Sequence, residues 1–404
     1  MLTKLPPAKP PEWFGDRWRE LLIVCLIGLA VLAVAYWRTA PMDPQTFAQP
    51  WDHHKYIYIA QHGPLGFHIA PFCWRFLHPL VAGSLPWSLD VNFKILVMLE
   101  TFLAGILVYY LGRAAGYSQA ASIMALLVFY SIPDAVKGSL SAPWSVDQMS
   151  RMFVLAGFLL LVRGKPGFSS IALAAGVCAK ETVVITAPLY YCWTARKWID
   201  TRQFARAALF ALPILATYAG VKLIIPAWNA NAEYVNSLTP ALSQVYNGQA
   251  SFQYVSVLRD MIGQDLAASR GWLLKAISIQ AFGIFAILPL FAIRDNLVLF
   301  VRLAAFVILT YVAMLFSSGF GRVLVLAFPA VALLAWSGVA SISKTTGAPE
   351  RLFAVAAIPV FLVTFASVER GWDPSLWQVA ILAGTLFVAF VWRKLPHGHN
   401  MEPK

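Results

Sequence analysis

Long apolar runs separated by short polar breaks recur from one end of the chain to the other. Runs of about 20 apolar residues have the length of a bilayer crossing. The runs predict crossings over residues 21–37, 92–111, 118–133, 149–163, 205–226, 272–293, 297–317, 322–341, 352–368 and 375–392. The pattern therefore predicts an all-α, polytopic transmembrane helical bundle.

One further apolar segment, residues 168–194, does not fit a single crossing. Arg163 and Lys165 precede it, and the basic cluster 196–206 follows it. A single crossing would place one of these clusters outside, whereas Lys and Arg collect in cytoplasmic loops. The pair Lys180-Glu181 interrupts the run, so we predict a short helical hairpin whose turn reaches the outer membrane face. A kinked single helix, with eleven crossings and an exoplasmic C-terminus, is the alternative.

The hairpin gives the chain a consistent orientation. With it, the basic clusters fall on one side, which predicts about twelve crossings and both termini in the cytoplasm. Three polar segments then lie outside, residues 38–91, 134–148 and 227–271. Nothing marks a separate soluble domain, so 1–404 is predicted to form a single integral-membrane domain.

Composition supports this class of protein. Of 404 residues, 59% are hydrophobic and only 12% are charged, against about 25% charged in a soluble domain. The net charge of +12 comes from basic residues in short loops between crossings, so it reports orientation and does not indicate a nucleic-acid partner. The four cysteines show no metal-ligand spacing.

The first outer segment contains a dense polar and aromatic group, Trp51-Asp52-His53-His54-Lys55-Tyr56. A carboxylate at a membrane surface can act as a general base if it reaches an acceptor hydroxyl and its pKa suits the task. We expect Asp52 to be this base, with a solvated loop aspartate as the alternative. His53, His54 and Tyr56 are expected to help bind the substrate. The side chains of two adjacent residues point in different directions. At most one of the two histidines is therefore expected to lie beside Asp52.

Several short motifs follow this group in order along the chain. They are Ile59-Ala60-x-x-Gly63, Ala70-Pro71-Phe72-x-x-Arg75-Phe76-Leu77-x-Pro79-Leu80, Ala179-Lys180-Glu181-Thr182 and Gly321-Arg322-x-Leu324. With Trp51–Tyr56, this series resembles the GT-C superfamily of polyprenyl-phosphate-dependent integral-membrane glycosyltransferases, and more loosely its mannosyltransferase-like branch. In that superfamily a first-loop acidic residue acts as base or metal partner, and the resemblance gives this role to Asp52. The histidine pair departs from the usual acidic or small neighbours. That departure leaves open whether a divalent metal, Mg²⁺ or Mn²⁺ held by Asp52 and His53, takes part.

Three basic residues are candidates for binding the donor phosphate. Charges inside an apolar run are costly and mark function or a paired interaction, so we expect Lys180 to neutralise the phosphate and Glu181 to orient a partner or a sugar hydroxyl. The resemblance implies the same, because these enzymes place a lysine-containing turn beside the donor. Arg75 and Arg322 are the other candidates, since the planar donor fork of arginine suits phosphate oxygens. The alternatives are a plain polar tip at Lys180-Glu181, an anchor for an interfacial helix over 74–85 at Arg75, and headgroup snorkelling at Arg322.

Weaker candidates complete the set. His78 lies three residues after Arg75, on the same face of the predicted interfacial helix. The resemblance implies a second acidic group from the outer loop 134–148, and the sequence does not choose between Asp134 and Asp147. A solvated, capping aspartate is the alternative for each. Glu100 is expected to pair within the bundle, with contact to the substrate as the alternative.

These observations predict a glycosyltransferase. It would move a hexosyl or pentosyl group from a polyprenyl-monophosphate carrier to an acceptor hydroxyl of a glycan, lipid or protein, with inversion and Asp52 as base. Membrane lipids are its other expected partners, and the expected location is a bacterial inner membrane with the site on the periplasmic (exoplasmic) face. No Gly-rich nucleotide-binding loop is present, which argues against a nucleotide-sugar donor. A secondary transporter or lipid flippase, or a non-catalytic assembly subunit, are the alternatives.

Overall fold

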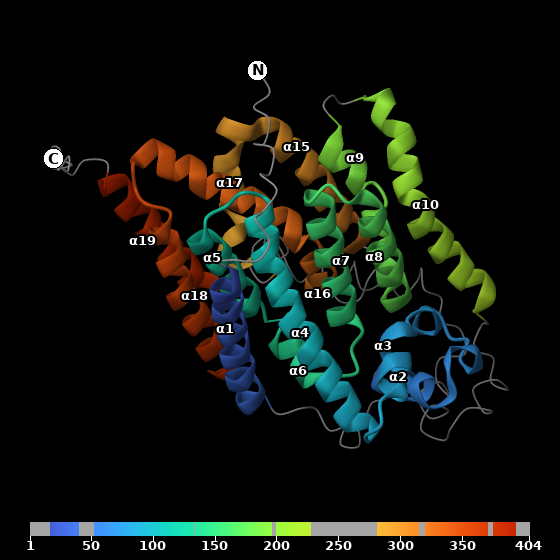
Figure 1. The fold of residues 1–404 in the computed structure, drawn as a ribbon. Helices are drawn as coiled ribbons and strands as arrows, with labels where there is room; N and C mark the ends of the chain where they lie inside the picture. The colour runs from blue at the N-terminus through green and yellow to red at the C-terminus, as the bar shows by residue number, and fades with distance from the viewer. Residues whose placement is uncertain are drawn as a thin grey trace, which may run out of the picture.

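A computed structural model describes residues 17–39, 52–133, 135–195, 199–227, 281–314, 320–370 and 375–392, which form only helices and their connections (Figure 1). Within this part of the chain the predicted all-α class is confirmed. Among the described residues, five helices are long and apolar enough to span a membrane: α1 (Arg17–Arg38), α4 (Leu89–Ala114), α10 (Thr201–Ile224), α15 (Pro289–Met314) and the run Arg322–Thr346 that contains α17 (Phe328–Thr346). Shorter apolar helices are α5 (Gln119–Ser131), α8 (Pro166–Ala179), α18 (Arg351–Arg370) and α19 (Ser375–Trp392). The chain is an integral-membrane protein, and the total of about twelve crossings stays a prediction.

The segment predicted as a hairpin does fold back on itself. After α8 the chain turns at Lys180 and returns through the 3₁₀ helix η3 (Glu181–Thr186) and α9 (Leu189–Thr194). The Ser170 hydroxyl donates to the Phe210 carbonyl at 2.5 Å, and the Tyr190 ring lies 5.6 Å from the Phe210 ring. Ser170 and Tyr190 therefore meet the same turn of α10, which a single continuous helix could not achieve.

The two ends of the bundle carry different sets of charged residues. Helix α7 (Asp147–Val162) is antiparallel to α8, as the bond from Ser169 Oγ to the Gly157 carbonyl shows. The first residue of α7 and the hairpin turn therefore share one end, the lower end in Figure 1. At the other end Arg113 pairs with Glu20 at 3.2 Å. This is the end predicted to face the cytoplasm.

One predicted boundary is confirmed and one predicted element differs from the structure. The predicted break between crossings 272–293 and 297–317 is present, because α15 consists of two helices that meet at a kink at Asn296 (φ −146°, ψ 53°). Residues 272–280 lie outside the described part. The predicted interfacial helix over 74–85 is shorter, α3 (Leu77–Ser84), and follows the 3₁₀ helix η2 (Phe72–Trp74). The reason is Pro79, whose ring would clash with the carbonyl four residues earlier, that of Arg75, in a longer helix. Arg75 and His78 consequently do not share a helical face.

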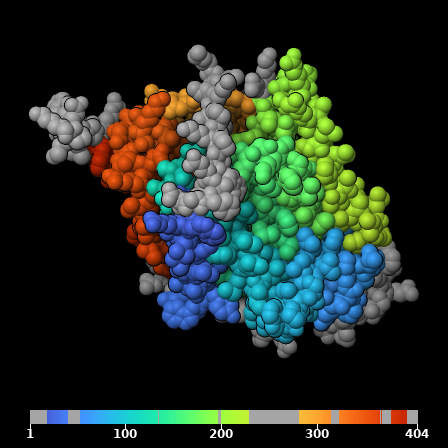
Figure 2. Space-filling model, viewed as in Figure 1, coloured from blue at the N-terminus to red at the C-terminus, as the bar shows by residue number. Residues whose placement is uncertain are grey.

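A small second core forms at the lower end of the bundle. It joins residues 52–84, here called the first-loop module, to α4, α7 and α8 through buried side chains of Tyr56, Ile59, Phe93, Met149 and Ala179. The module comprises α2 (Asp52–His62), the 3₁₀ helix η1 (Pro64–Gly66), η2 and α3. Figure 2 shows it as a blue lobe against the lower part of α4. The module thus lies against the hairpin turn and the start of α7.

Four short helical elements complete the described part of the bundle. They are α6 (Lys137–Ser141), the 3₁₀ helix η4 (Gly283–Ala286), α16 (Phe320–Leu324) and the 3₁₀ helix η5 (Val325–Ala327). Helix α16 brings Arg322 to the first residue of α7. Most of the predicted outer segment 227–271 lies outside the described residues.

Candidate active site

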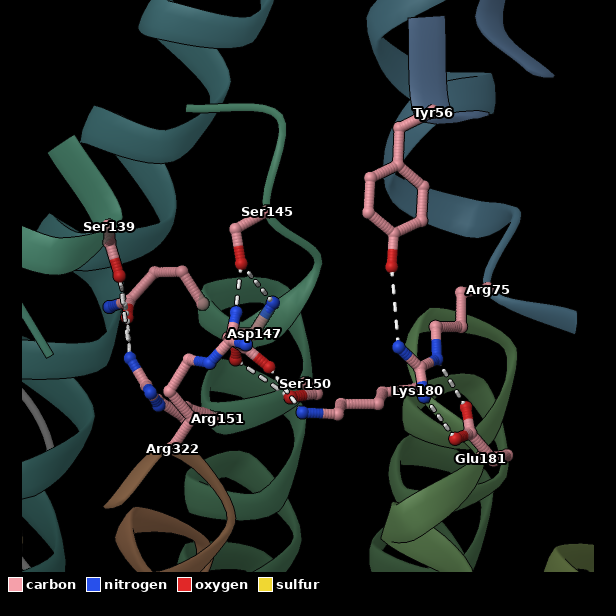
Figure 3. Close-up of polar contacts among 11 residues, drawn as sticks. Tyr56, Arg75, Ser139, Ser145, Asp147, Ser150, Arg151, Lys180, Glu181 and Arg322 are labelled. Carbon is pink, nitrogen blue, oxygen red and sulfur yellow. Dashed lines mark hydrogen bonds and ion pairs between the residues drawn. The ribbon is translucent and has the colours of Figure 1, made fainter. Parts of the chain in front are cut away.

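Lys180 occupies the turn of the hairpin, between α8 and η3. Its side chain is buried, with only 7% exposed, and its ammonium forms an ion pair with Asp147 Oδ1 (Figure 3). An ammonium has three N–H donors. Among the described residues Asp147 is the one hydrogen-bond acceptor that Lys180 meets. A buried cation with donors to spare is costly unless a further acceptor binds there.

Asp147, the first residue of α7, collects several partners. Besides Lys180, its carboxylate accepts from Arg322 at 3.3 Å and from the Ser145 hydroxyl at 3.0 Å. Burial raises the pKa of this carboxyl, but Lys180, Arg322 and Arg151 outweigh burial and hold the pKa well below its usual value. Asp147 is therefore a fixed counter-charge and is poorly suited to act as a base. Asp134, the other candidate for the second acidic group of the outer loop, lies outside the described residues.

Arg322 is the exposed member of this group. Its side chain is 44% exposed, whereas Asp147 is 6% exposed. A ligand arriving at the lower end of the bundle would therefore meet the Arg322 guanidinium before it reaches Lys180.

Arg75 joins the first-loop module to the hairpin turn. Its Nε and Nη2 donate to the two carboxylate oxygens of Glu181 at 2.7 and 2.5 Å, and its Nη1 lies 3.4 Å from the Tyr56 hydroxyl. Burial raises the pKa of Glu181, but Arg75, followed by Lys180, lowers it below the usual value. The bidentate edge of Arg75 is thus occupied by protein, and Glu181 sits directly beside Lys180 in the chain.

Arg151 belongs to the site although the sequence analysis did not select it. It lies one helical turn after Asp147, is 2% exposed, and donates from Nη1 to Ser139 Oγ and Gln148 Oε1 at 3.3 and 3.2 Å. The signal was present, because an arginine inside a predicted crossing marks function or pairing. We call Arg75, Asp147, Arg151, Lys180, Glu181 and Arg322 the cation cluster. Four basic and two acidic side chains give it a formal charge of +2 (4 − 2).

Of the two histidines that follow Asp52, His53 is buried and His54 is half-buried. His53 is 1% exposed and packs its ring 5.1 Å from that of Trp144 and 4.0 Å from that of His54. Burial, followed by the charge of Lys55, lowers the pKa of His54. The Asp52 side chain lies outside the described residues, so its role as base, and a metal at Asp52 and His53, stay predictions. Within the described side chains, no group of three or more His, Cys, Asp and Glu residues is arranged to hold a metal ion.

His78 and Glu100 form a buried pair beside the cation cluster. His78 Nδ1 lies 2.9 Å from Glu100 Oε1, and Nε2 lies 3.1 Å from the Pro143 carbonyl oxygen. Glu100 thus pairs within the bundle, as expected. His78, predicted to bind substrate, instead has both ring nitrogens occupied by protein.

Comparison with known proteins adds one structural similarity. No protein-family model and no curated protein sequence matches the chain. Among solved structures, it is similar to the crystal structure of the Archaeoglobus fulgidus oligosaccharyltransferase in complex with Zn and sulfate, with a TM-score of 0.45 and 14% identity. The match covers 94% of this chain and 54% of that one, so the chain spans about half the length of the oligosaccharyltransferase. A similarity at this level does not establish a common fold or activity.

Proposed function

We propose that this protein is an integral-membrane glycosyltransferase that takes a sugar from a polyprenyl-monophosphate carrier at the exoplasmic face. The observation that carries the proposal is the buried Lys180 ammonium, which meets a single described acceptor and lies in a cluster of net positive charge. Phosphate oxygens are strong acceptors for such a group. The site also lies at the end of apolar helices, where the headgroup of a membrane lipid would be found.

The cation cluster supports a division of labour at the donor. Lys180 and Arg322 would contact the phosphate, because one has donors to spare and the other is exposed. Asp147 would hold both cations in place through its two carboxylate oxygens. Arg75 would act mainly through Glu181, which keeps the hairpin turn and its lysine in position.

The proposed reaction is a direct displacement at the anomeric carbon. Asp52 takes the proton of the acceptor hydroxyl, the hydroxyl oxygen forms the new glycosidic bond, and the bond between the anomeric carbon and the phosphate oxygen breaks with inversion. The phosphate group gains negative charge as it leaves, and preorganised cations stabilise such charge strongly. The sugar would be a hexose or pentose and the acceptor a glycan, lipid or protein. The GT-C-like motifs support this role for Asp52. The proposed location of the reaction is a bacterial inner membrane.

Sugar transfer by the purified full-length protein tests this function. Labelled polyprenyl-monophosphate sugars, hexoses and pentoses, would be supplied in liposomes with an extract of a bacterial envelope that contains its lipids, glycans and proteins as acceptors. We expect transfer from at least one donor. D52N should lower the rate by roughly 100-fold or more, as loss of a general base does, and K180M by a similar factor, as loss of a charge-stabilising donor does.

Lys94 provides the matched control. It lies in α4 near the same end of the bundle and pairs with the exposed Asp90 at 2.5 Å instead of with a member of the cation cluster. K94M should transfer sugar within about twofold of wild type, since exposed pairs contribute little. Full activity in K180M would exclude the phosphate site, full activity in D52N would exclude the base, and no release of sugar from any donor by wild type would exclude the function.

A further inference from the structure

The segment 143–147 leads directly into the cation cluster and is held at successive residues. The Pro143 carbonyl faces His78 Nε2 at 3.1 Å. The Trp144 ring packs against that of His53, and the Ser145 hydroxyl donates to Asp147. Any shift of this segment would therefore move the carboxylate that contacts Lys180 and Arg322.

The hydrogen-bond chemistry of His78 fixes which atoms carry protons. The Pro143 carbonyl can only accept, so Nε2 must carry a hydrogen. Nδ1 faces a carboxylate oxygen of Glu100, so one further proton lies between these two atoms. Burial lowers the pKa of His78, but Glu100, the Pro143 carbonyl and Asp147 together raise it above the usual value. His78 thus donates from Nε2 to the Pro143 carbonyl and shares one further proton with Glu100.

Burial makes this arrangement costly to disturb. His78 is fully buried and Glu100 is 2% exposed. His78 belongs to α3, Glu100 to α4 and Pro143 to the segment before α7. The two contacts of His78 therefore link three separate parts of the chain. Removing the donor at Nε2 would leave the Pro143 carbonyl without this bond.

We propose that His78 and Glu100 are positioning residues for the phosphate site, holding the Pro143 carbonyl and thereby the Asp147 carboxylate that orients Lys180 and Arg322. This inference rests on the proposed function, because it assigns the pair to the site that would bind the donor phosphate. Neither residue would touch the ligand.

Binding of farnesyl monophosphate to the purified full-length protein tests the inference, with two pairs of variants. Glutamine places an amide N–H near the position of histidine Nε2 and asparagine does not, so H78Q should keep the bond to Pro143 and H78N should lose it. We expect the dissociation constant of H78N to rise about 10-fold, the loss typical of one missing bond to a buried acceptor. H78Q should stay within about threefold of wild type.

The Glu100 variants decide the question if a His78 variant fails to fold. E100Q can donate from its amide to Nδ1 of a neutral His78, so it should bind within about threefold of wild type, whereas E100M should bind about 10-fold more weakly. Equal binding by H78Q and H78N, or by E100Q and E100M, would overturn the inference. If K180M abolishes binding while H78N and E100M bind as wild type does, the positioning role is wrong and the proposed site stands. Failure of wild type to bind would refute the site itself.

Discussion

At the scale of single residues, the site depends on where its charges are buried. Lys180 and Asp147 neutralise each other inside the protein, while Arg322 contacts the same carboxylate from a more exposed position. A buried pair of this kind adds little net stability, because desolvation offsets attraction. Its value lies in holding a lysine ready for an anion. The two carboxylates present, Asp147 and Glu181, have lowered pKa values, so neither competes with Asp52 for the role of base.

The protonation of Lys180 makes a prediction about pH. Burial lowers the pKa of its ammonium below the usual 10.5, Asp147 opposes the fall, and Arg75 and Arg322 add to it. The charged form exists below this lowered pKa, so affinity for an anion is present at low pH and is lost as pH rises through it. Affinity of wild type for farnesyl monophosphate should therefore begin to fall at a pH below 10.5.

K180R is the control for this titration, because arginine stays charged throughout the range. Measurements should be made above about pH 7.5, where the phosphate of the ligand has lost its second proton. K180R should show no fall over the interval in which wild type loses affinity. Parallel curves for the two proteins would show that Lys180 is not the titrating group.

Several site residues could be predicted from sequence, and their partners could not. Lys180, Glu181 and Arg322 stand out as charges in apolar surroundings, and the structure brings them to one end of the bundle. The contacts of Arg75 with Glu181 and of Arg322 with Asp147 join residues 106 and 175 positions apart. Such contacts are set by how the helices pack, which periodicity does not report. The choice of Asp147 escaped for the same reason, whereas Arg151 could have been selected as an arginine inside a predicted crossing.

At the scale of elements, the hairpin and the first-loop module form one unit through the pair of Arg75 and Glu181. Both side chains are about six-sevenths buried, with 14% and 15% exposed. A double-mutant cycle with R75M and E181Q should give a coupling energy of about 1–3 kcal/mol in unfolding free energy, as expected for contacting, buried partners. The exposed pair of Lys94 and Asp90 should give about 0.3–0.5 kcal/mol. Additive effects of the two substitutions on the unfolding free energy would mean that the pair of Arg75 and Glu181 does not join the hairpin to the first-loop module.

Helix α17 approaches the start of α15 closely at Gly338. A Cβ atom there would lie 2.0 Å from the Leu288 carbonyl oxygen, a backbone atom that cannot move away cheaply. G338A should lower the free energy of unfolding by about 1–3 kcal/mol, the usual cost of overpacking. Gly384 in α19 is the control, since a Cβ there meets nothing within 4 Å. G384A should be neutral or slightly stabilising, and equal stability of the two variants would contradict this close approach.

The hairpin was predictable because charge placement constrains topology more tightly than hydropathy does. The break at Asn296 was marked by the polar residues 294–296, and the structure has two helices meeting there. The length of α3 depended on Pro79, whose effect was present in the sequence and was missed. Which glycines sit at helix contacts is a property of packing, and sequence alone does not separate Gly338 from Gly384.

At the scale of the whole molecule, the predicted orientation places the cation cluster outside and Arg113 inside. Single cysteines in a variant lacking the four native ones would test this with a membrane-impermeant thiol reagent on intact cells and on inverted vesicles. G167C, in the first turn of α8, should react only from the cytoplasmic side, and L65C, in the exposed part of the first-loop module, only from outside. Reaction of both from one side would contradict the arrangement of the ends, and exchanged reactivities would reverse the orientation.

The most direct test of the central claim is an experimental structure of the protein with a bound polyprenyl monophosphate. The account predicts phosphate density within hydrogen-bond distance of the Lys180 ammonium and the Arg322 guanidinium, with the lipid chain leaving towards the apolar faces of the helices. Phosphate density at the opposite end of the bundle, near Arg113, with Lys180 and Asp147 unchanged, would contradict it.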